Sequence, residues 1–526
     1  MANTSLFSRI KGKLAPATTT TNEAGGAAYQ LSPEEALAQL ALTGCFNGTF
    51  YTSAAEQLDE VLTLSKQVSD EFIAKTAIYA RREGFMKDTP ALLCALLATR
   101  DLDLLETTFW EVIDNGKMLR NFVQIMRSGV TGRKSLGSAP RRLVRQWLNR
   151  ASDRDLINAS IGQSPSLADI VKMVHPKPRN ESREAFYAWL IGRDHPTELL
   201  PTAIADFEIY KQRGRGALPD VPFQMLTSLQ LGKQEWSTIA KRASWQMTRM
   251  NLNTFLRHDV FTDPEIVKCV ANRLSNPELI RRAKVFPFQI LSAFLNADPK
   301  LPDLIRESLQ DALEISIQNV PSFCGSVVVA PDISGSMHSP VTGHRAGSSS
   351  KVRCLDAAAL TAAAVLRKNK RAMVLPFACD VVGPEICRLN PRDSVMTNAT
   401  KLARLPAGGT NCSSVIKHLN RNKLAPDLVI YVSDNESWLD SPHYGHFFGQ
   451  APTATLQAWN ELKQRNPKAK LVCIDIQPYA TTQASTRNDI LNIGGFSDQI
   501  FKVIARFATE GHQASSLLDE INAINI

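Results

Sequence analysis

The chain has 526 residues, of which 44% are hydrophobic and 21% are charged, and its formal net charge is +9. A chain of this length has room for about two to four domains, each able to bury its own core. The hydrophobic content excludes an intrinsically disordered protein. No apolar run approaches the roughly 20 residues that a helix needs to cross a bilayer, which excludes a transmembrane protein.

The cysteines and the N-terminal segment give the expected compartment. Nine cysteines are spread along the chain without a C-x-x-C pair, which argues against a disulfide framework or a zinc ribbon and favours the reducing cytoplasm. The start lacks the apolar stretch of a secretory signal. Residues 1–28 are therefore predicted to be a disordered tail. Because basic residues precede the first acid, Glu23, a transit peptide is the alternative.

Residues 29–320 have the pattern of many short helices. Ser32 followed by Pro33, Glu34 and Glu35 is typical of an N-cap, a proline in the first turn and acids near the positive end of the helix dipole. About fifteen segments with similar starts follow, with hardly one alternating strand among them. Short helices joined by brief connections favour an α-solenoid, although the sequence shows no clear repeat.

From about residue 321 to the end, strands alternate with helices. Short β-branched runs at 326–330, 372–377, 427–432 and 470–476 predict buried strands. Helical patterns at 355–367, 413–419 and 454–465 lie between or beside them. This alternation predicts a doubly wound α/β domain over residues 321–526. Ligands of such sheets bind beyond the carboxyl ends of the strands.

Three loops at strand ends or before helices carry oxygen side chains that suit a divalent cation. Asp332, Ser334 and Ser336 follow the first strand, Thr410 follows two glycines, and Asp434 follows the strand at 427–432. Such oxygen ligands are those that Mg²⁺ prefers. Their types and order match the metal-ion-dependent adhesion site of von Willebrand factor type A (vWA) domains. The alternative is a polar turn in a vWA domain that does not bind metal.

A catalytic site is an alternative interpretation of the loop at residue 332. In phosphotransferases of the haloacid dehalogenase type, the first strand ends in an aspartate nucleophile, and an acid/base carboxylate follows two residues later. Here that position is Ser334, which cannot act as an acid or base. The chain also lacks H-E-x-x-H, G-x-S-x-G and P-loop motifs. We therefore predict that the protein is not an enzyme.

The positive charge is concentrated in two segments of the helical half. Residues 116–150 contain nine bases and no acid: Lys117, Arg120, Arg127, Arg133, Lys134, Arg141, Arg142, Arg145 and Arg150. A second cluster consists of Lys172, His175, Lys177 and Arg179. Solvated helix faces usually mix signs, so these segments favour the binding of phosphates. The alternatives are a solvated face for the first segment and a loop or core histidine for His175. The helical half carries no RNA-recognition motif, so RNA would be read by its shape, ends or loops.

A helical half with a basic flank followed by a vWA domain resembles the Ro ribonucleoprotein family of TROVE-domain proteins, in a bacterial or phage-type member. The resemblance is carried by residues 48–51, 74–81, 86–92, 169–178, 332–337 and 431–437. It implies a monomeric ring of HEAT-like helical repeats over residues 29–320, closed by the vWA domain. It also implies that His175 occupies the place of the family's histidine that contacts Y RNA. Asn158 and Gly162 stand where eukaryotic members carry a basic pair, which is a departure from the family.

The resemblance implies a non-catalytic function in RNA quality control. Family members hold single-stranded ends of misfolded RNAs and bind small noncoding Y RNAs, and bacterial members use a Y RNA to tether an exoribonuclease. Three hypotheses follow for this chain: an RNA-binding scaffold, a protein-binding module that acts through its metal site, and a hydrolase.

Overall fold

The computed structural model describes residues 16–43, 46, 47, 49, 51–214, 216–283, 287–341, 343, 351–439, 452–495, 499–510 and 517–526. The chain divides into two compact units. We call the first the sheet-containing unit; it comprises Met1–Val68, Ile280–Asn296 and Leu309–Ala523. The second, the helical unit, comprises Ser69–Leu279, Ala297–Ser308 and Ile524–Ile526.

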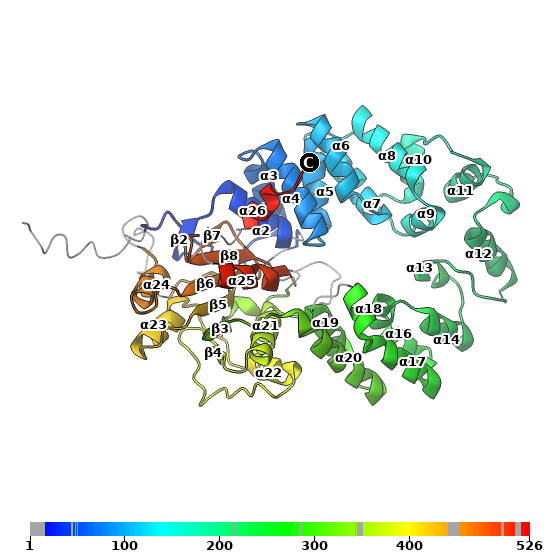
Figure 1. The fold of residues 1–526 in the computed structure, drawn as a ribbon. Coiled ribbons are helices and arrows are strands. Elements are labelled where there is room, and N and C mark those ends of the chain that lie inside the picture. The colour runs from blue at the N-terminus through cyan, green and yellow to red at the C-terminus, as the bar shows by residue number, and fades with distance from the viewer. Residues whose placement is uncertain are drawn as a thin grey trace, which may run out of the picture. The chain divides into compact units, whose positions relative to one another are not determined.

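The helical unit consists of short helices in close succession, as predicted (Figure 1). Neighbours along the chain pack together, for example α4 on α5 and α6. Its helices are α4 (Asp70–Arg82), α5 (Asp88–Leu97), α6 (Leu102–Val112), α7 (Gly116–Ser128), α8 (Ser138–Arg150), α9 (Asp153–Ala159), α10 (Leu167–Val174), α11 (Glu181–Ile191), α12 (Thr202–Arg213), α13 (Phe223–Leu226), α14 (Lys233–Arg242), α15 (Trp245–Met250), α16 (Leu252–Arg257) and α17 (Pro264–Leu274), with 3₁₀ turns η1 (Thr197–Leu199) and η2 (Val260–Thr262). Helices α18 (Pro277–Ala283) and α20 (Asp303–Ser316) each span a boundary between the units.

Local side chains begin many of these helices. Ser166 accepts a hydrogen bond from the backbone N–H of Asp169, and the Asp169 carboxylate accepts one from the backbone N–H of Ser166, which completes a capping box for α10. Asp263 caps α17, whose first residue is Pro264. These starts were predicted from the sequence. Each such cap contributes about 1 kcal/mol to stability.

One buried charge connects α11 to the end of α8. Arg183 is 1% exposed, and its guanidinium donates to the carbonyl oxygens of Leu148 at 2.8 Å and Ala151 at 3.0 Å. It also donates to the Asp153 carboxylate at 2.8 Å. Burial of a charged group is costly unless it is hydrogen-bonded in this way, so Arg183 holds the two helices in one arrangement.

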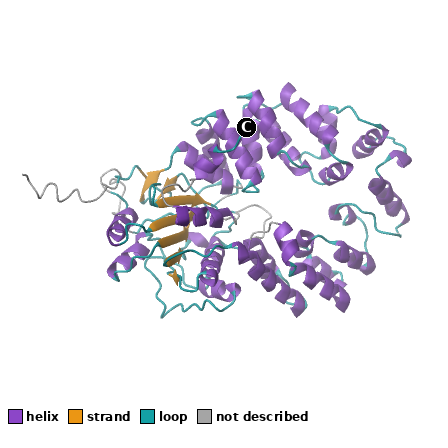
Figure 2. Ribbon diagram, in the orientation of Figure 1, coloured by secondary structure: helices purple, strands orange, loops and turns teal. Residues whose placement is uncertain are grey.

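The sheet-containing unit is built on a parallel five-stranded sheet (Figure 2), with the strands in the order β4-β3-β5-β6-β8 (labelled in Figure 1). The strands are β3 (Val327–Pro331), β4 (Met373–Val374), β5 (Leu428–Ser433), β6 (Lys470–Asp475) and β8 (Ile490–Gly494). The prediction of a doubly wound α/β domain is confirmed. The strand predicted over 372–377 is only two residues long, and β8 was not predicted.

Helices cover both faces of this sheet. On one face, α23 (Ser413–Arg421) and α24 (Ala454–Arg465) bury Ile416 and Trp459 against strand side chains that include Val328 and Tyr431. On the other face, α21 (Cys354–Lys368) packs on β3, β5 and α22 (Val395–Leu402). The unit also contains α2 (Pro33–Thr43), α3 (Ala54–Ser65), α19 (Pro287–Asn296), α25 (Gln499–Glu510), α26 (Leu517–Asn522) and the 3₁₀ turns η3 (Ile317–Asn319) and η4 (Ser336–His338).

The N-terminal segment belongs to this unit. Strands β1 (Thr20–Thr21) and β2 (Ala27–Gln30) form an antiparallel sheet with β7 (Thr481–Thr482), and Tyr29 is buried in the core beside α24. The structure thus divides the chain differently from the predicted domains 1–28, 29–320 and 321–526. Residues 16–28 of the predicted tail are structured, because backbone pairing and the Tyr29 ring tie them to the sheet-containing unit. Residues 1–15 lie outside the described residues.

The cysteines and the helix lengths can also be compared with the sequence predictions. All cysteines in the described part of the chain are free, in agreement with the absence of a predicted disulfide framework; Cys45 lies outside that part. Among the helices that the structure describes, none has the length and apolarity needed to cross a membrane.

Candidate metal centre and nucleic-acid interface

The first loop of the candidate metal centre follows β3 directly. Asp332, Ser334 and Ser336 are all buried. The backbone N–H of Ser334 donates to Asp332 Oδ1 at 2.7 Å, and the Oγ atoms of Ser334 and Ser336 are 3.3 Å apart. This short-range bonding folds the loop so that one carboxylate and two hydroxyls lie together beyond the carboxyl end of the strand.

Two other loops join this one. The backbone N–H of Gly335 donates to the Gly408 carbonyl at 3.0 Å, which brings the loop of Thr410 alongside. Ser433, at the end of β5, donates to Asp332 Oδ2 at 2.5 Å, and Asp434 comes next along the chain. Thr410 and Asp434 are also buried. The structure therefore gathers all five predicted ligands on loops that contact one another.

The electrostatics of this site fit a cation. Burial, together with the neighbouring Asp434 carboxylate, raises the pKa of Asp332 to about 7, and burial also raises the pKa of Asp434. A divalent cation between the two carboxylates would remove their mutual repulsion and keep both ionised. Carboxylate and hydroxyl oxygens are a donor set that suits Mg²⁺. The described residues contain no group of three or more His, Cys, Asp or Glu side chains placed to hold a metal ion, and the candidate donor set here combines two carboxylates with three hydroxyls.

Two more buried carboxylates lie near the predicted set. Asp475 ends β6, and Glu436 follows Asp434. Burial and the Asp434 charge raise the pKa values of both carboxyl groups. Within the part of the chain that the structure describes, Glu436 Oε1 and Asp475 Oδ1 have no hydrogen-bond partner. Asp475 was not predicted as a site residue from the sequence; its position at the end of a parallel strand was the available signal.

Residues from the N-terminal part cover this edge of the sheet. The Tyr51 hydroxyl hydrogen-bonds to the Ser336 side chain, and burial raises the pKa of Tyr51. The Tyr51 ring packs edge-on against Tyr479, with centroids 5.8 Å apart, and the Tyr479 hydroxyl bonds to Thr49 Oγ1 at 3.1 Å. The backbone N–H of Ala24 donates to Glu436 at 3.2 Å. This cover could not be predicted, because it joins segments several hundred residues apart in the sequence.

The predicted RNA-binding residues all lie in the helical unit, and most are exposed. The exposed ones are Lys117, Arg127, Arg133, Lys134, Arg141, Arg142, Arg150, Lys172, His175, Lys177 and Arg179. Arg142 pairs with Glu106 at 2.8 Å, and Arg150 stacks over the Trp110 ring at 4.1 Å. Because of these two contacts, less of each guanidinium is available to bind a phosphate than the sequence suggested.

Two of the predicted RNA-binding residues have structural roles. Arg120 is half-buried and donates to the carbonyls of Ala159 and Ile161, and burial lowers its pKa. Arg145 donates to the carbonyl of Val174 at the end of α10. Gly162, one of the departures from the family, lies against Arg120: a side chain there would begin 2.6 Å from the guanidinium. A larger residue there would have to displace the guanidinium, and the φ of +114° at Gly162 is a conformation that side chains rarely adopt.

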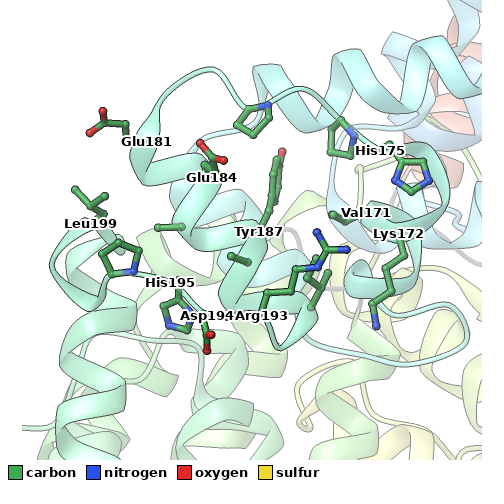
Figure 3. Close-up of a pocket in the computed structure, with 16 residues that line it drawn as sticks. Val171, Lys172, His175, Glu181, Glu184, Tyr187, Arg193, Asp194, His195 and Leu199 are labelled. Atoms are coloured by element: carbon green, nitrogen blue, oxygen red, sulfur yellow. Dashed lines mark hydrogen bonds between the residues drawn. The ribbon is translucent and has the colours of Figure 1, made fainter.

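Two hollows adjoin in the basic region. The first, of about 770 Å³, is lined by Arg127, Asp169 and Lys172 among others. The second, of about 540 Å³, lies between the end of α10 and α11 and includes Lys172 and His175 (Figure 3). Lys172 is shared by both. The structure thus provides concave, partly basic surfaces around three of the predicted residues, although Asp169 brings one acid into the first hollow.

Comparisons with known proteins identify the doubly wound α/β domain as a vWA domain. Residues 326–508 match the domain described as the Ro60 vWA domain. The chain is 24% identical to RNA-binding protein RO60 of Deinococcus radiodurans over 93% of this chain and 94% of that protein. It is also 24% identical to RNA-binding protein RO60 of Caenorhabditis elegans over 47% of this chain and 37% of that protein.

The solved structure of the Deinococcus radiodurans Ro protein has a similar fold. It aligns with a TM-score of 0.61 and 21% identity, over 91% of this chain and all of that one. The predicted resemblance to the Ro family is therefore confirmed, and the chain combines a helical N-terminal region with a Ro60-type vWA domain.

Proposed function

We propose that this protein is a non-catalytic RNA-binding protein of the Ro type. On this proposal its helical unit binds small structured RNAs of the Y type and single-stranded ends of misfolded RNA, as a scaffold for RNA quality control and decay, with an exoribonuclease as a partner tethered through RNA. Two relatives are named RNA-binding proteins.

The observation that carries the proposal is the exposed basic surface of α7, α8 and their connection. Arg127, Arg133, Lys134 and Arg141 are exposed side chains in a 35-residue segment without an acid. Each phosphate that such a cation neutralises releases counterions, so this surface supplies affinity for any RNA that fits it.

The test replaces Arg127, Arg133, Lys134 and Arg141 together with alanine. We expect the Kd for a small structured RNA to rise about tenfold or more, and the slope of log K against log salt to flatten by about 0.7–0.9 for each phosphate that is no longer neutralised. Binding would be measured by fluorescence anisotropy at several salt concentrations. Sequencing of RNA that crosslinks to wild-type protein in cells identifies the ligand.

The matched control removes the same charge elsewhere. Lys370, Arg371, Arg388 and Arg421 are exposed cations of the sheet-containing unit, and their joint replacement by alanine leaves RNA affinity within about twofold of the wild type. Equal losses in both variants would mean that only net charge matters and would contradict the assigned surface.

A second candidate function is suggested by the buried oxygen cluster of Asp332, Ser334, Ser336, Thr410 and Asp434. In this proposal the cluster holds Mg²⁺, and the metal binds the carboxylate of a partner protein. The donor set and the raised pKa of the two aspartates support metal binding. The binding of a partner protein is tested with Asp332→Asn. This variant should abolish a protein interaction and leave RNA binding intact, whereas the quadruple alanine variant of the basic surface should do the reverse.

A further inference from the structure

The hollow between α10 and α11, which we call the His175 hollow, has walls fixed by two helix ends. Helix α10 ends at His175, whose φ of +48° turns the chain away from the helix axis. Helix α11 ends at Gly192 with φ of +73°, where the backbone N–H of Arg193 donates to the Ala188 carbonyl at 2.8 Å. This helix-end motif holds Arg193 beside the hollow. The backbone at the ends of α10 and α11 therefore determines the shape of the hollow.

The lining of the His175 hollow combines apolar side chains with separated charges of both signs. Its apolar lining comes from Pro176, Pro178, Ala185, Ala188 and Ile191. Figure 3 shows Glu181 and Glu184 on one side, Lys172 and His175 on the other, and Arg193 between them, with Asp194 next to Arg193. A simple anion site would not include three carboxylates. The lining instead matches a ligand with an anion at one end, a flat body and hydrogen-bond donors at the other end.

A nucleotide with a guanine base has this chemistry. Guanine presents two adjacent N–H donors, N1–H and N2–H, and a carboxylate has two oxygens that can accept both at once. Single-stranded RNA is read through such base edges and through packing of the flat base. Lys172 and Arg193 would then face the phosphate.

We propose that the His175 hollow binds a guanine nucleotide of single-stranded RNA, with Glu184 or Glu181 accepting from the base and Lys172 and Arg193 binding the phosphate. The inference rests on the proposed function and names the nucleotide that this part of the surface selects. The adjoining hollow supports a strand rather than a free nucleotide, because it shares Lys172 and adds Arg127 for a neighbouring phosphate.

The experiment compares two hexanucleotides, oligouridylate and the same strand with one guanine, on the full chain. We expect the guanine-containing strand to bind about fivefold tighter or more, which is the least that a good bidentate pair contributes. The double variant Glu181→Gln, Glu184→Gln should reduce this preference to less than about twofold. The variant Arg193→Ala should weaken binding of both strands.

The controls lie outside the hollow. Glu198→Gln and Arg213→Ala change exposed residues of the same region and should keep the preference. Equal affinity for the two strands in the wild type, or a preference that survives the double glutamine variant, would overturn the inference. Binding of guanosine monophosphate as tight as that of the strand would overturn its RNA part.

Failure of the inference is distinguishable from failure of the proposed function. If a structured RNA binds wild-type protein and the alanine variant of the basic surface loses it, while guanine has no effect, only the guanine inference fails. If neither structured nor single-stranded RNA binds, the proposed function fails as well.

Discussion

The two units place the charges of their candidate sites in opposite environments. In the helical unit, cations such as Arg133 and Lys134 are exposed, and acids are absent from the segment that carries them. In the sheet-containing unit, the carboxylates of Asp332, Asp434 and Asp475 are buried. Exposed charges are screened by salt and suit a polyanion that can shift its position. Buried charges of one sign are destabilising unless a fixed counter-charge joins them.

Arg183 departs from this pattern, because it is a buried cation of the helical unit. We expect Arg183→Met to destabilise the protein by about 4 kcal/mol, since the Ala151 carbonyl and the Asp153 carboxylate lose the guanidinium as a donor. The Leu148 carbonyl retains the Tyr187 hydroxyl as a donor. Arg179→Met, in the same segment but exposed, should change stability by less than about 0.5 kcal/mol. Denaturant unfolding of the full chain measures both. Equal stability of the two variants would show that burial of Arg183 is not what connects α8 and α11.

The buried carboxylates of the sheet-containing unit should lower its stability when no cation is bound. Without divalent cations, we expect Asp332→Asn to raise Tm, because it removes one of two neighbouring buried charges. Mg²⁺ should stabilise the wild type by about 2.7 kcal/mol at a hundred times its Kd and should not stabilise the variant. Glu461→Gln, at an exposed site, should respond to Mg²⁺ as the wild type does. Thermal unfolding with and without Mg²⁺ is the measurement; a Tm that Mg²⁺ does not change would contradict a metal centre.

The smallest expected effect concerns Tyr51. Its hydroxyl hydrogen-bonds to Ser336, a proposed metal ligand, so Tyr51→Phe should free that oxygen. We expect Mg²⁺ affinity to rise about two- to fivefold, the value of one net hydrogen bond. Tyr210→Phe, in the helical unit, is the control and should leave the affinity unchanged. Calorimetric titration measures the change, and a lower affinity in Tyr51→Phe would mean that the hydroxyl supports the metal centre.

The parts of the fold set by local sequence were predictable. The caps Ser166 and Asp263 determine where α10 and α17 begin, and side chains within three residues form them. The first loop of the candidate metal centre was also predictable, because Asp332, Ser334 and Ser336 follow a buried strand directly. Parallel strands end at one edge of the sheet, so Asp434 had to lie near this loop.

The parts set by distant contacts were not predictable. The pairing of β2 with β7 joins residues about 450 positions apart, and no local pattern announces it. Arg120 and Arg145 look the same in sequence as the exposed Arg141, but neighbouring backbone carbonyls occupy their guanidinium groups. Charge counting cannot separate a surface cation from one that bonds to backbone; only the burial of its guanidinium does so.

The position of Tyr29 has a consequence for synthesis and for fragment design. Its ring fills the core beside Trp459, and its hydroxyl accepts from the Thr453 backbone N–H at 3.3 Å. During translation this first part of the chain must wait for more than 400 further residues before its partners exist, whereas the helices of residues 69–279 can pack soon after they leave the ribosome. A fragment that starts at residue 321 would lack β2 and Tyr29, and it would expose the apolar site that they cover. We therefore expect a vWA-domain fragment to be stable only when the N-terminal segment is supplied, in the same chain or as a separate peptide.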